Sequence, residues 1–274
     1  MATKSVSPVK HDAPASWDEL LGAAVNEPGT ISAAYSAFHN YSVGNQMLAI
    51  WQCHMRGIQP GPLGTFKAWI DKGRAVRKGE KAIVLCQPKP FMRVEHDDDT
   101  GDDTVRSGVW FSYRPSWFVV SQTDGEDAVA PVLPEWTPER ALEALEVRQL
   151  PFLILDGNTQ GYAQKRQLAI NPVATNPLKT MAHELAHILL GHTGDSAAMD
   201  AGDMPRNLKE VEAEAVALIV VESLGMPGAE DARGYVQHWP GSGQSIPESS
   251  AQRIFTAADR ILRAGRPVAS VEGE

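Results

Sequence analysis

Apolar and polar residues follow two different periods along the chain, and each period predicts a different kind of element. Apolar residues at helical spacing predict helices at about residues 16–25, 31–38, 42–56, 65–72, 138–148, 177–190, 208–222 and 248–262. Short runs rich in apolar and aromatic residues predict strands at residues 82–86, 109–113, 117–121, 152–155 and 167–171. The mixture predicts an α+β protein.

The length of 274 residues predicts two modest domains. Residues 124–137 are rich in Pro, Glu and Asp and form the predicted linker. It joins a first domain at residues 16–123 to a second at residues 138–265. The polar ends, residues 1–15 and 266–274, are predicted to be disordered.

The net charge of −9 argues by itself against a nucleic-acid-binding protein. The charge is uneven, however: residues 1–94 hold eleven Lys and Arg against six Asp and Glu, and the remainder holds 14 against 28. An asymmetry of this kind suggests two separate functions. The acidic run at residues 95–103 lacks the glutamate that closes a calcium loop and is predicted to be a solvated hairpin tip.

The two cysteines, Cys53 and Cys86, form no C-x-x-C pair, so disulfides and thiolate metal sites are not expected. The first 16 residues lack the apolar core of a signal peptide. The longest apolar run, at residues 215–221, is too short to span a membrane. These observations predict a cytoplasmic protein without membrane contact.

Residues His183-Glu184-Leu185-Ala186-His187 form an H-E-x-x-H pattern inside an apolar helical segment that ends at Gly191. By chance the pattern occurs in on the order of one per cent of chains of this length. The two histidines lie four residues apart, on one helix face, and can bind one metal ion. Glu184 is then the candidate general base that activates water. A buried helix with two satisfied histidines is the alternative.

A catalytic zinc ion usually has a third protein ligand, and the helix at residues 208–222 offers Glu210, Glu212 and Glu214. At about 100° per residue, Glu210 and Glu214 share a face while Glu212 points the opposite way, so Glu212 is expected to face solvent. Ligand histidines usually donate their second N–H to a carboxylate. Glu214 can accept this bond if Glu210 is the ligand, which favours Glu210 as the ligand but leaves the reverse open.

The H-E-x-x-H pattern followed by a helix with a glutamate resembles the thermolysin-like zincins, and more closely the ImmA/IrrE-type and ArdC-type proteins. Four segments of the N-terminal half resemble the N-terminal domain of ArdC-type proteins, namely Tyr41-Ser42-x-x-Asn45, Trp69, residues 73–81 and residues 119–123. The resemblance implies a single-stranded-DNA-binding domain followed by a zincin domain that binds Zn²⁺ and cleaves a protein or peptide. It also implies an edge strand at residues 167–171 that holds an extended substrate.

Single-stranded DNA binding also agrees with residues 56–93, where nine basic residues stand against two acidic ones among several aromatic residues. The residues expected to contact DNA are Tyr41, Asn45, Trp69, Arg74, Arg77, Lys78 and Lys81. Tryptophans at helical spacing are more often core residues, and a basic turn is more often only solvated, so composition alone does not decide.

The predicted function is that of an ArdC-like antirestriction protein from a mobile element, with a zinc metallopeptidase site of His183, His187 and Glu210. His192 or Tyr235 is the candidate for stabilising an oxyanion. One rival is a regulatory protease of the ImmA type that cuts a repressor. The other is a DNA-binding module whose zinc is structural, which would leave Glu184 without a use.

Overall fold

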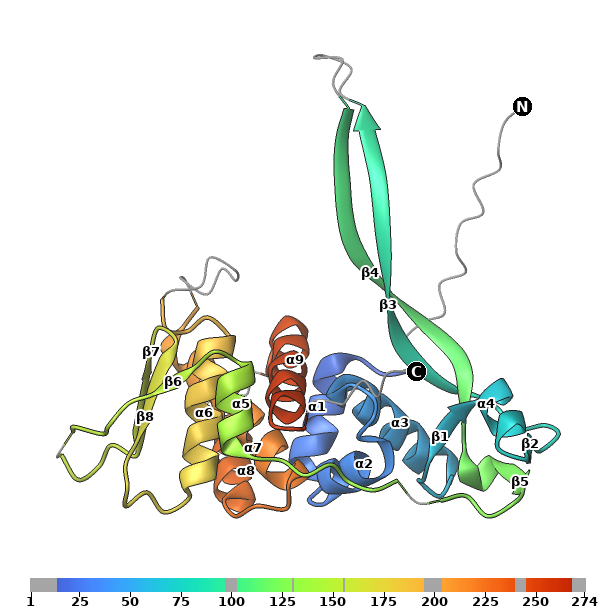
Figure 1. Cartoon of the computed structure of the whole chain (residues 1–274), viewed down its shortest axis with the longest axis horizontal. Helices are drawn as coiled ribbons and strands as arrows, with labels where there is room; N and C mark the ends of the chain where they lie inside the picture. Colours follow the sequence, from blue (N-terminus) through green and yellow to red (C-terminus); the bar gives the residue numbers. More distant parts are fainter. Residues whose placement is uncertain are drawn as a thin grey trace. The chain divides into compact units, whose positions relative to one another are not determined.

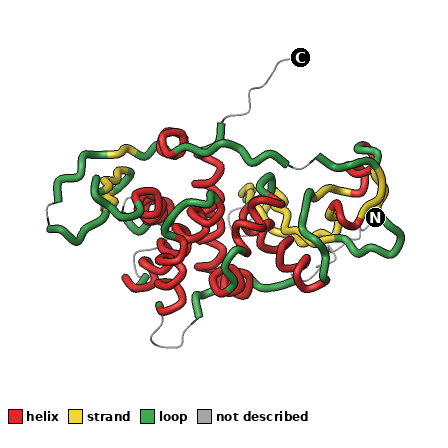
Figure 2. The backbone as a smooth tube through the Cα atoms, turned by 90° about the horizontal axis from the view of Figure 1, so that it is seen from below, coloured by secondary structure: helices red, strands yellow, loops and turns green. Residues whose placement is uncertain are grey.

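The computed structural model describes residues 14–96, 103–129, 131–154, 156–194, 204–239 and 245–267. Within these ranges the chain combines helices with three small sheets, which confirms the predicted α+β class (Figures 1 and 2). Disorder was predicted for residues 1–15 and 266–274, of which residues 1–13 and 268–274 lie outside the described residues. Most of the predicted acidic hairpin tip lies outside them as well.

The chain divides into two compact units. Unit 1 comprises Met1–Ala15 and Gln52–Ala128, and unit 2 comprises Ser16–Trp51 and Val129–Glu274. These units do not coincide with the domains predicted at residues 16–123 and 138–265, because Ser16–Trp51 packs with the C-terminal part of the chain.

Unit 2 is built around helix α7 (Arg206–Ser223), which is buried from Val211 to Ser223. Its run of Ala, Val, Leu and Ile is apolar on every side, as a central helix requires. Helices α6, α8, α9 and α2 pack against α7 (Figure 1). The other helices of the unit are α1 (Trp17–Asn26), α2 (Thr30–Phe38), the first part of α3 (Val43–Arg56), α5 (Pro138–Ala144), α6 (Pro177–Leu189), α8 (Ala229–His238) and α9 (Glu248–Ala264).

Helices α1 and α2 are tied to the C-terminal helices by apolar and polar contacts. A capping box opens α1, because the backbone N–H of Ser16 donates to Glu19 at 2.8 Å and the Ser16 hydroxyl accepts from the Glu19 N–H at 3.4 Å. The Trp17 ring lies edge-on to Phe255 of α9, with ring centroids 6.0 Å apart. The N–H of Gly29 donates to Glu222 of α7 at 2.9 Å. These contacts are the physical reason why the N-terminal helices belong to unit 2.

The sheet of unit 2 has the strand order β6–β8–β7, with β6 (Arg148–Gln149), β7 (Gly161–Gln164) and β8 (Gln167–Ile170). Strand β8 is central, parallel to β6 and antiparallel to β7. The predicted strand at residues 152–155 is wrong for residues 152–154, which have no regular structure, and residue 155 lies outside the described residues. In this strand order the edge strand beside α6 is β7, which the sequence did not predict. The strand expected at the edge, residues 167–171, corresponds to the central strand β8.

In unit 1, strands β3 (Ile83–His96) and β4 (Asp103–Val119) form one long hairpin that extends from the rest of the unit (Figure 1). The strands predicted separately at residues 109–113 and 117–121 are largely one strand, β4, and the second prediction also runs into the turn η1 (Val120–Gln122). The remaining elements are β1 (Leu63–Thr65), which pairs with β4, α4 (Phe66–Asp71), and the pair β2 (Arg74–Val76) and β5 (Thr123–Gly125).

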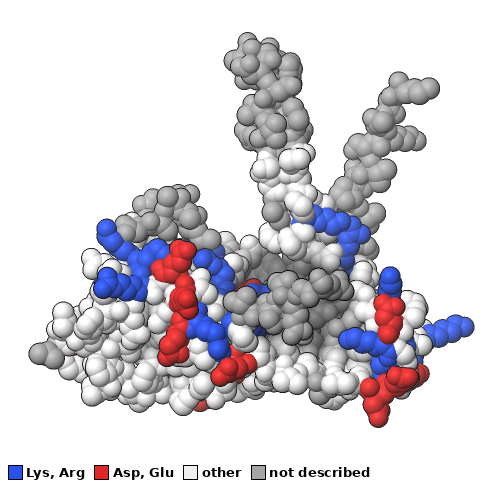
Figure 3. Space-filling view, viewed as in Figure 1, with Lys and Arg blue, Asp and Glu red and all other residues white. Residues whose placement is uncertain are grey.

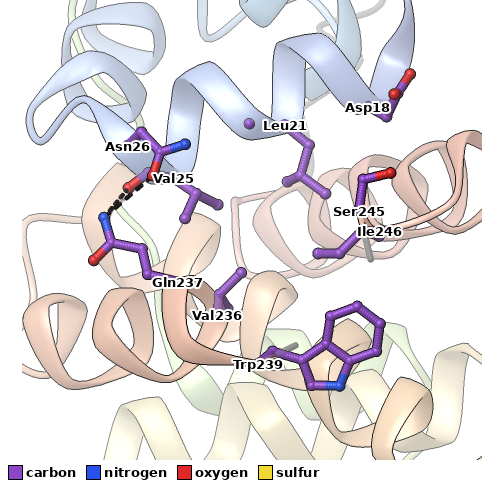
Figure 4. A pocket seen from close by; sticks show the side chains of 10 residues that line it. Asp18, Leu21, Val25, Asn26, Val236, Gln237, Trp239, Ser245 and Ile246 are labelled. Carbon is purple, nitrogen blue, oxygen red and sulfur yellow. Dashed lines mark hydrogen bonds between the residues drawn. The ribbon is translucent and has the colours of Figure 1, made fainter. Parts of the chain in front are cut away.

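Among the described residues, no helix is long and apolar enough to cross a membrane. Unit 2 contains a pocket of about 200 Å³ between α1 and α8, lined by Leu21, Val25, Val236 and Trp239 among others (Figure 4). No residue of the H-E-x-x-H segment or of the α7 glutamates lines this pocket. The candidate chemistry therefore lies elsewhere in unit 2.

Candidate metal centre

Helix α6 carries the H-E-x-x-H segment. It begins with Pro177 in its first turn, where a missing N–H costs nothing, and ends before Gly191, whose φ of 76° takes the chain into the left-handed region. Its buried residues include Leu185 and Ile188. The helix packs on α7, and this pairing brings His183 and His187 to the start of α7.

Three side chains converge there. The Nε2 atoms of His183 and His187 lie 3.0 Å apart, and Oε2 of Glu210 lies 3.5 Å and 3.6 Å from them. Within the described residues, these three form the group of histidine, cysteine and acidic side chains able to hold a metal ion. A circle through three atoms at these separations has a radius of about 2.0 Å, which is the length of a Zn–N or Zn–O bond. Two histidines and one glutamate therefore fit a divalent metal ion.

The charges of this cluster favour a bound cation. Burial lowers the pKa of His183, but hydrogen bonds to Glu210 and Glu214 raise it by a larger amount, so the pKa is about 9. Hydrogen bonds from His183 and His187 hold the pKa of Glu210 well below its usual range. Without a metal ion the cluster therefore holds a proton at neutral pH, where a cation can replace it.

Glu214 lies behind His183. Its Oε2 accepts a hydrogen bond from Nδ1 of His183 at 2.8 Å, and its Oε1 lies 2.5 Å from Nζ of Lys179. Burial raises the pKa of Glu214, but the bonds from His183 and Lys179 lower it by more. An ionised Glu214 keeps a proton of His183 on Nδ1, so Nε2 is the atom that can lose its proton and bind a metal ion.

Glu184 is 7% exposed and lies close enough to both histidines for their charges to act on it. Burial raises its pKa, as expected for a carboxylate that takes up a proton at neutral pH. Strand β7 passes beside it: a Cβ atom added to Gly161 would lie 3.2 Å from Oε1 of Glu184 and 2.7 Å from Cγ2 of Thr180. A glycine is needed at this point because the edge strand approaches α6 so closely.

Two expectations about the surroundings of the cluster are wrong. Glu212 was expected to face solvent, but it is 0% exposed, because α7 is covered by other helices on the side away from His183 as well. His192 was expected to be available to an oxyanion, but its side chain is 2% exposed and both ring nitrogens are bonded. Nδ1 lies 2.9 Å from Nδ1 of His187, and Nε2 lies 3.0 Å from Oε2 of Glu212.

Tyr235, the other oxyanion candidate, lies on α8 and is 47% exposed. Burial raises the pKa of its hydroxyl, and the charges of Glu210 and Glu214 raise it further. Its hydroxyl is therefore near the cluster, protonated and accessible.

The residues expected to contact DNA are divided between the two units. Tyr41 and Asn45 are half-buried in unit 2, whereas the others lie in unit 1. Trp69 must be corrected: its ring is 1% exposed and its indole N–H donates to the Phe118 carbonyl at 2.8 Å, so it has no free face for a base.

The four basic residues of unit 1 that were expected to contact DNA form two groups, arginines with partners in the protein and exposed lysines. Arg74 donates to the hydroxyl and carbonyl oxygens of Thr123 at 2.8 Å and 2.9 Å. Arg77 pairs with Asp124 at 3.4 Å and also with Glu80 at 2.9 Å, so both arginines contact the segment around β5. Lys78 and Lys81 are exposed.

Sequence reasoning missed three residues that contact the cluster or its supports. Lys179 lies four residues before His183 and so shares its helix face, a signal that was available. Gly161 and Arg253, which lies 3.6 Å from Glu212, are distant in sequence and become neighbours only through the fold.

Two helices that present two histidines and a glutamate to one point define the class of the protein, an α+β protein with a candidate divalent-metal centre. Comparison with known proteins adds a family. Residues 17–116 match the sequence model of the N-terminal domain of anti-restriction factor ArdC.

The metal-free crystal structure of the antirestriction protein ArdC from plasmid R388 is similar over 91% of this chain and 94% of that one, with 18% identity and a TM-score of 0.52. The Mn(II)-bound structure of that protein aligns over 93% and 97%, with 17% identity and a TM-score of 0.48. No curated protein sequence matches. The chain therefore has the fold of this ArdC structure, and residues 17–116 match the ArdC N-terminal domain family.

Proposed function

We propose that the protein is a zinc-dependent peptidase that acts in antirestriction, as the resemblance of its sequence to ArdC-type proteins suggested. The observation that carries the proposal is the triangle of His183, His187 and Glu210 with the buried Glu184 beside it. A structural zinc site is closed by four protein ligands and has no use for a nearby general base. Three ligands with such a carboxylate support catalysis.

Zn²⁺ held by these three residues would supply a Lewis acid for a peptide carbonyl and for the attacking water. Glu184 accepts the proton of this water and passes it to the leaving amine, a transfer for which its raised pKa suits it. Tyr235 donates its hydroxyl proton in a hydrogen bond to the oxyanion. Strand β7 offers its outer edge to an extended peptide beside Glu184.

The test is Glu184→Gln, which keeps the shape of the side chain and removes its basicity. We expect unchanged Zn²⁺ affinity and complete loss of hydrolysis of a peptide library incubated with the zinc-loaded protein. Glu222→Gln, a buried glutamate at the other end of α7, is the matched control and should retain hydrolysis. Loss of zinc in Glu184→Gln would contradict its assignment as general base.

The same variant separates the rival functions. If Glu184→Gln still protects unmethylated plasmid DNA from a restricting host, antirestriction does not depend on peptidase activity. If the wild-type protein binds Zn²⁺ but cleaves nothing in the library, the zinc is structural or the substrate is specific, as for a regulatory protease.

We further propose that unit 1 binds single-stranded DNA on one face of the β3–β4 hairpin. Residues paired across an antiparallel ladder share a face, and alternate residues occupy opposite faces. Lys89 pairs with Trp110 and Phe91 pairs with Gly108, so these residues lie on one face. This cationic–aromatic face replaces the buried Trp69 as the candidate stacking surface.

The side chains of this face are arranged for stacking and for phosphate contacts. Lys89 lies over the Trp110 ring, 5.6 Å from its centroid. The Phe91 ring, 42% exposed, lies across Gly108, where a Cβ atom would be only 2.7 Å from it. Lys and Arg side chains are visible at the base of the hairpin (Figure 3). Aromatic rings that alternate with cations are what sequence-tolerant single-strand binding requires.

We expect Trp110→Ala and Phe91→Ala to weaken binding of a short single-stranded oligonucleotide by about 1–3 kcal/mol each. Phe111→Ala is the matched control, because Phe111 is 65% exposed on the opposite face of the same hairpin. Lys89→Gln should reduce the dependence of log affinity on log salt by roughly 0.7. Fluorescence anisotropy of the full chain checks these values, and an equal loss in Phe111→Ala would contradict the choice of face.

A further inference from the structure

A line of buried polar side chains extends from His187 away from the candidate metal centre. It runs from Nδ1 of His187 to His192 at 2.9 Å, from His192 to Glu212 at 3.0 Å, and from Glu212 to Arg253 at 3.6 Å. Gly191 makes this line possible, because its left-handed backbone turns the chain back after α6 and the N–H of His192 donates to the His187 carbonyl at 2.8 Å. Three helices, α6, α7 and α9, are joined by it.

The hydrogen-bonding capacity of these groups fixes the direction of every bond. If Nε2 of His187 is to bind a metal ion, its proton must be on Nδ1, so His187 donates to His192. His192 then accepts at Nδ1, carries its own proton on Nε2, and donates to Glu212, which when ionised can only accept. The reverse tautomer of His187 would require His192 to point a lone pair at this carboxylate. With both imidazoles neutral and Glu212 ionised, only one arrangement satisfies all of the groups.

The positioning network can therefore be defined as His192, Glu212 and Arg253. Resting on the proposed metal centre, we propose that this network holds His187 in its metal-binding tautomer and orientation. The two ligand histidines are then supported differently. His183 bonds directly to Glu214, whereas His187 reaches its carboxylate, Glu212, only through the second imidazole of His192.

The surroundings of Glu212 argue that it is kept for this purpose and not for stability. It is 0% exposed and stands between the fully buried Val211 and Ala213. Among the described residues, its Oε1 atom and the Nε atom of Arg253 are buried without a hydrogen-bond partner. A buried ion pair with unused donors and acceptors is weak evidence of stabilisation, since apolar residues of similar volume often serve as well. Arg253 also donates to the Leu190 carbonyl at 2.6 Å, which fastens the end of α6.

The test compares the Zn²⁺ affinity of full-length variants with their thermal stability in the metal-free state. His192→Leu removes both hydrogen bonds, whereas the amide of His192→Gln can accept from His187 and donate to Glu212. Competition with a chromophoric chelator should show affinity reduced by roughly 10–100-fold in His192→Leu and close to the wild-type value in His192→Gln. The visible spectrum of bound Co²⁺, which reports on the ligand field, should change more in His192→Leu than in His192→Gln.

Glu212→Leu has a matched control in Glu222→Leu. Glu222 is 9% exposed on the same helix and pairs with the buried Arg233, remote from the three ligands. Each change leaves one arginine without its carboxylate, so both should lower the melting temperature, but only Glu212→Leu should weaken Zn²⁺ binding. Equal losses of affinity in the two variants, or unchanged affinity in His192→Leu, would overturn the positioning network. A wild-type protein that binds no Zn²⁺ would instead remove the metal centre itself.

Discussion

At the scale of residues, three glutamates near the start of α7 have one chemistry and three different surroundings. The side chain of Glu210 is 34% exposed and faces both histidines. Glu214 is 6% exposed between His183 and Lys179, and Glu212 is 0% exposed behind His192. The accessible carboxylate is the one that an incoming cation can reach, and each buried carboxylate contacts a histidine.

These surroundings make metal affinity depend on pH. The pKa of His183 is raised to about 9, and Zn²⁺ binds only the neutral imidazole, so the ion must displace a proton at any lower pH. Apparent affinity should therefore rise with pH, by roughly tenfold per unit for one proton, and level off near pH 9. Glu210, with its lowered pKa, stays ionised over this range.

Titrations between about pH 6.5 and 8.5 check this expectation. Calorimetry in two buffers of different ionisation enthalpy should show the release of about one proton for each ion bound. An affinity that is flat over this interval, with no proton released, would show that His183 is already neutral in the metal-free protein.

At the scale of elements, sequence pattern located most of the helices, because their apolar stripes are long and their ends carry recognisable residues. It missed the short helix α8 (Ala229–His238). Helix α6 was expected at residues 177–190 and spans Pro177–Leu189. The pattern also indicated that Glu210 and Glu214 share a face. It could not show that the opposite face, with Glu212, is covered by further helices, since helical periodicity gives the direction of a side chain and not what lies there.

The strands were harder to predict. Strand β7 is four residues long and half-buried, with no clear alternation, and its place beside Glu184 depends on antiparallel pairing with β8. The segment at residues 152–154 is apolar but forms no strand, and Leu153 is 78% exposed. The face that carries Lys89 and Trp110 could not be predicted either, because the register of the β3–β4 hairpin is needed to define it.

At the scale of the whole molecule, the order of segments along the chain differs from their grouping in space. Residues 16–51 lie between the two segments of unit 1 in the sequence but pack into unit 2. The N–H of Val43 donates to Asp259 at 3.1 Å, and the buried Arg233 donates to the carbonyls of Ala24 and Val25. The family model that covers residues 17–116 therefore spans parts of both units.

This grouping predicts the result of cutting the chain between the two predicted domains. Val129 and Val132 are 88% and 86% exposed, so a specific protease site inserted next to Val132 should be accessible. We expect the two fragments to elute as one complex in size-exclusion chromatography, because α1 and α2 remain packed on α7, α8 and α9. Separation should require denaturant.

Trp17→Ala supplies the control for this experiment. It removes the ring that contacts Phe255, so the fragments of this variant should part at a lower urea concentration than those of the cut wild-type protein. If the wild-type fragments elute separately in native buffer, residues 16–123 fold on their own and the division predicted from the sequence is the correct one. If they stay together, unit 2 is a single folding body assembled from both ends of the chain, and a metal centre formed by α6 and α7 requires the N-terminal helices for its stability.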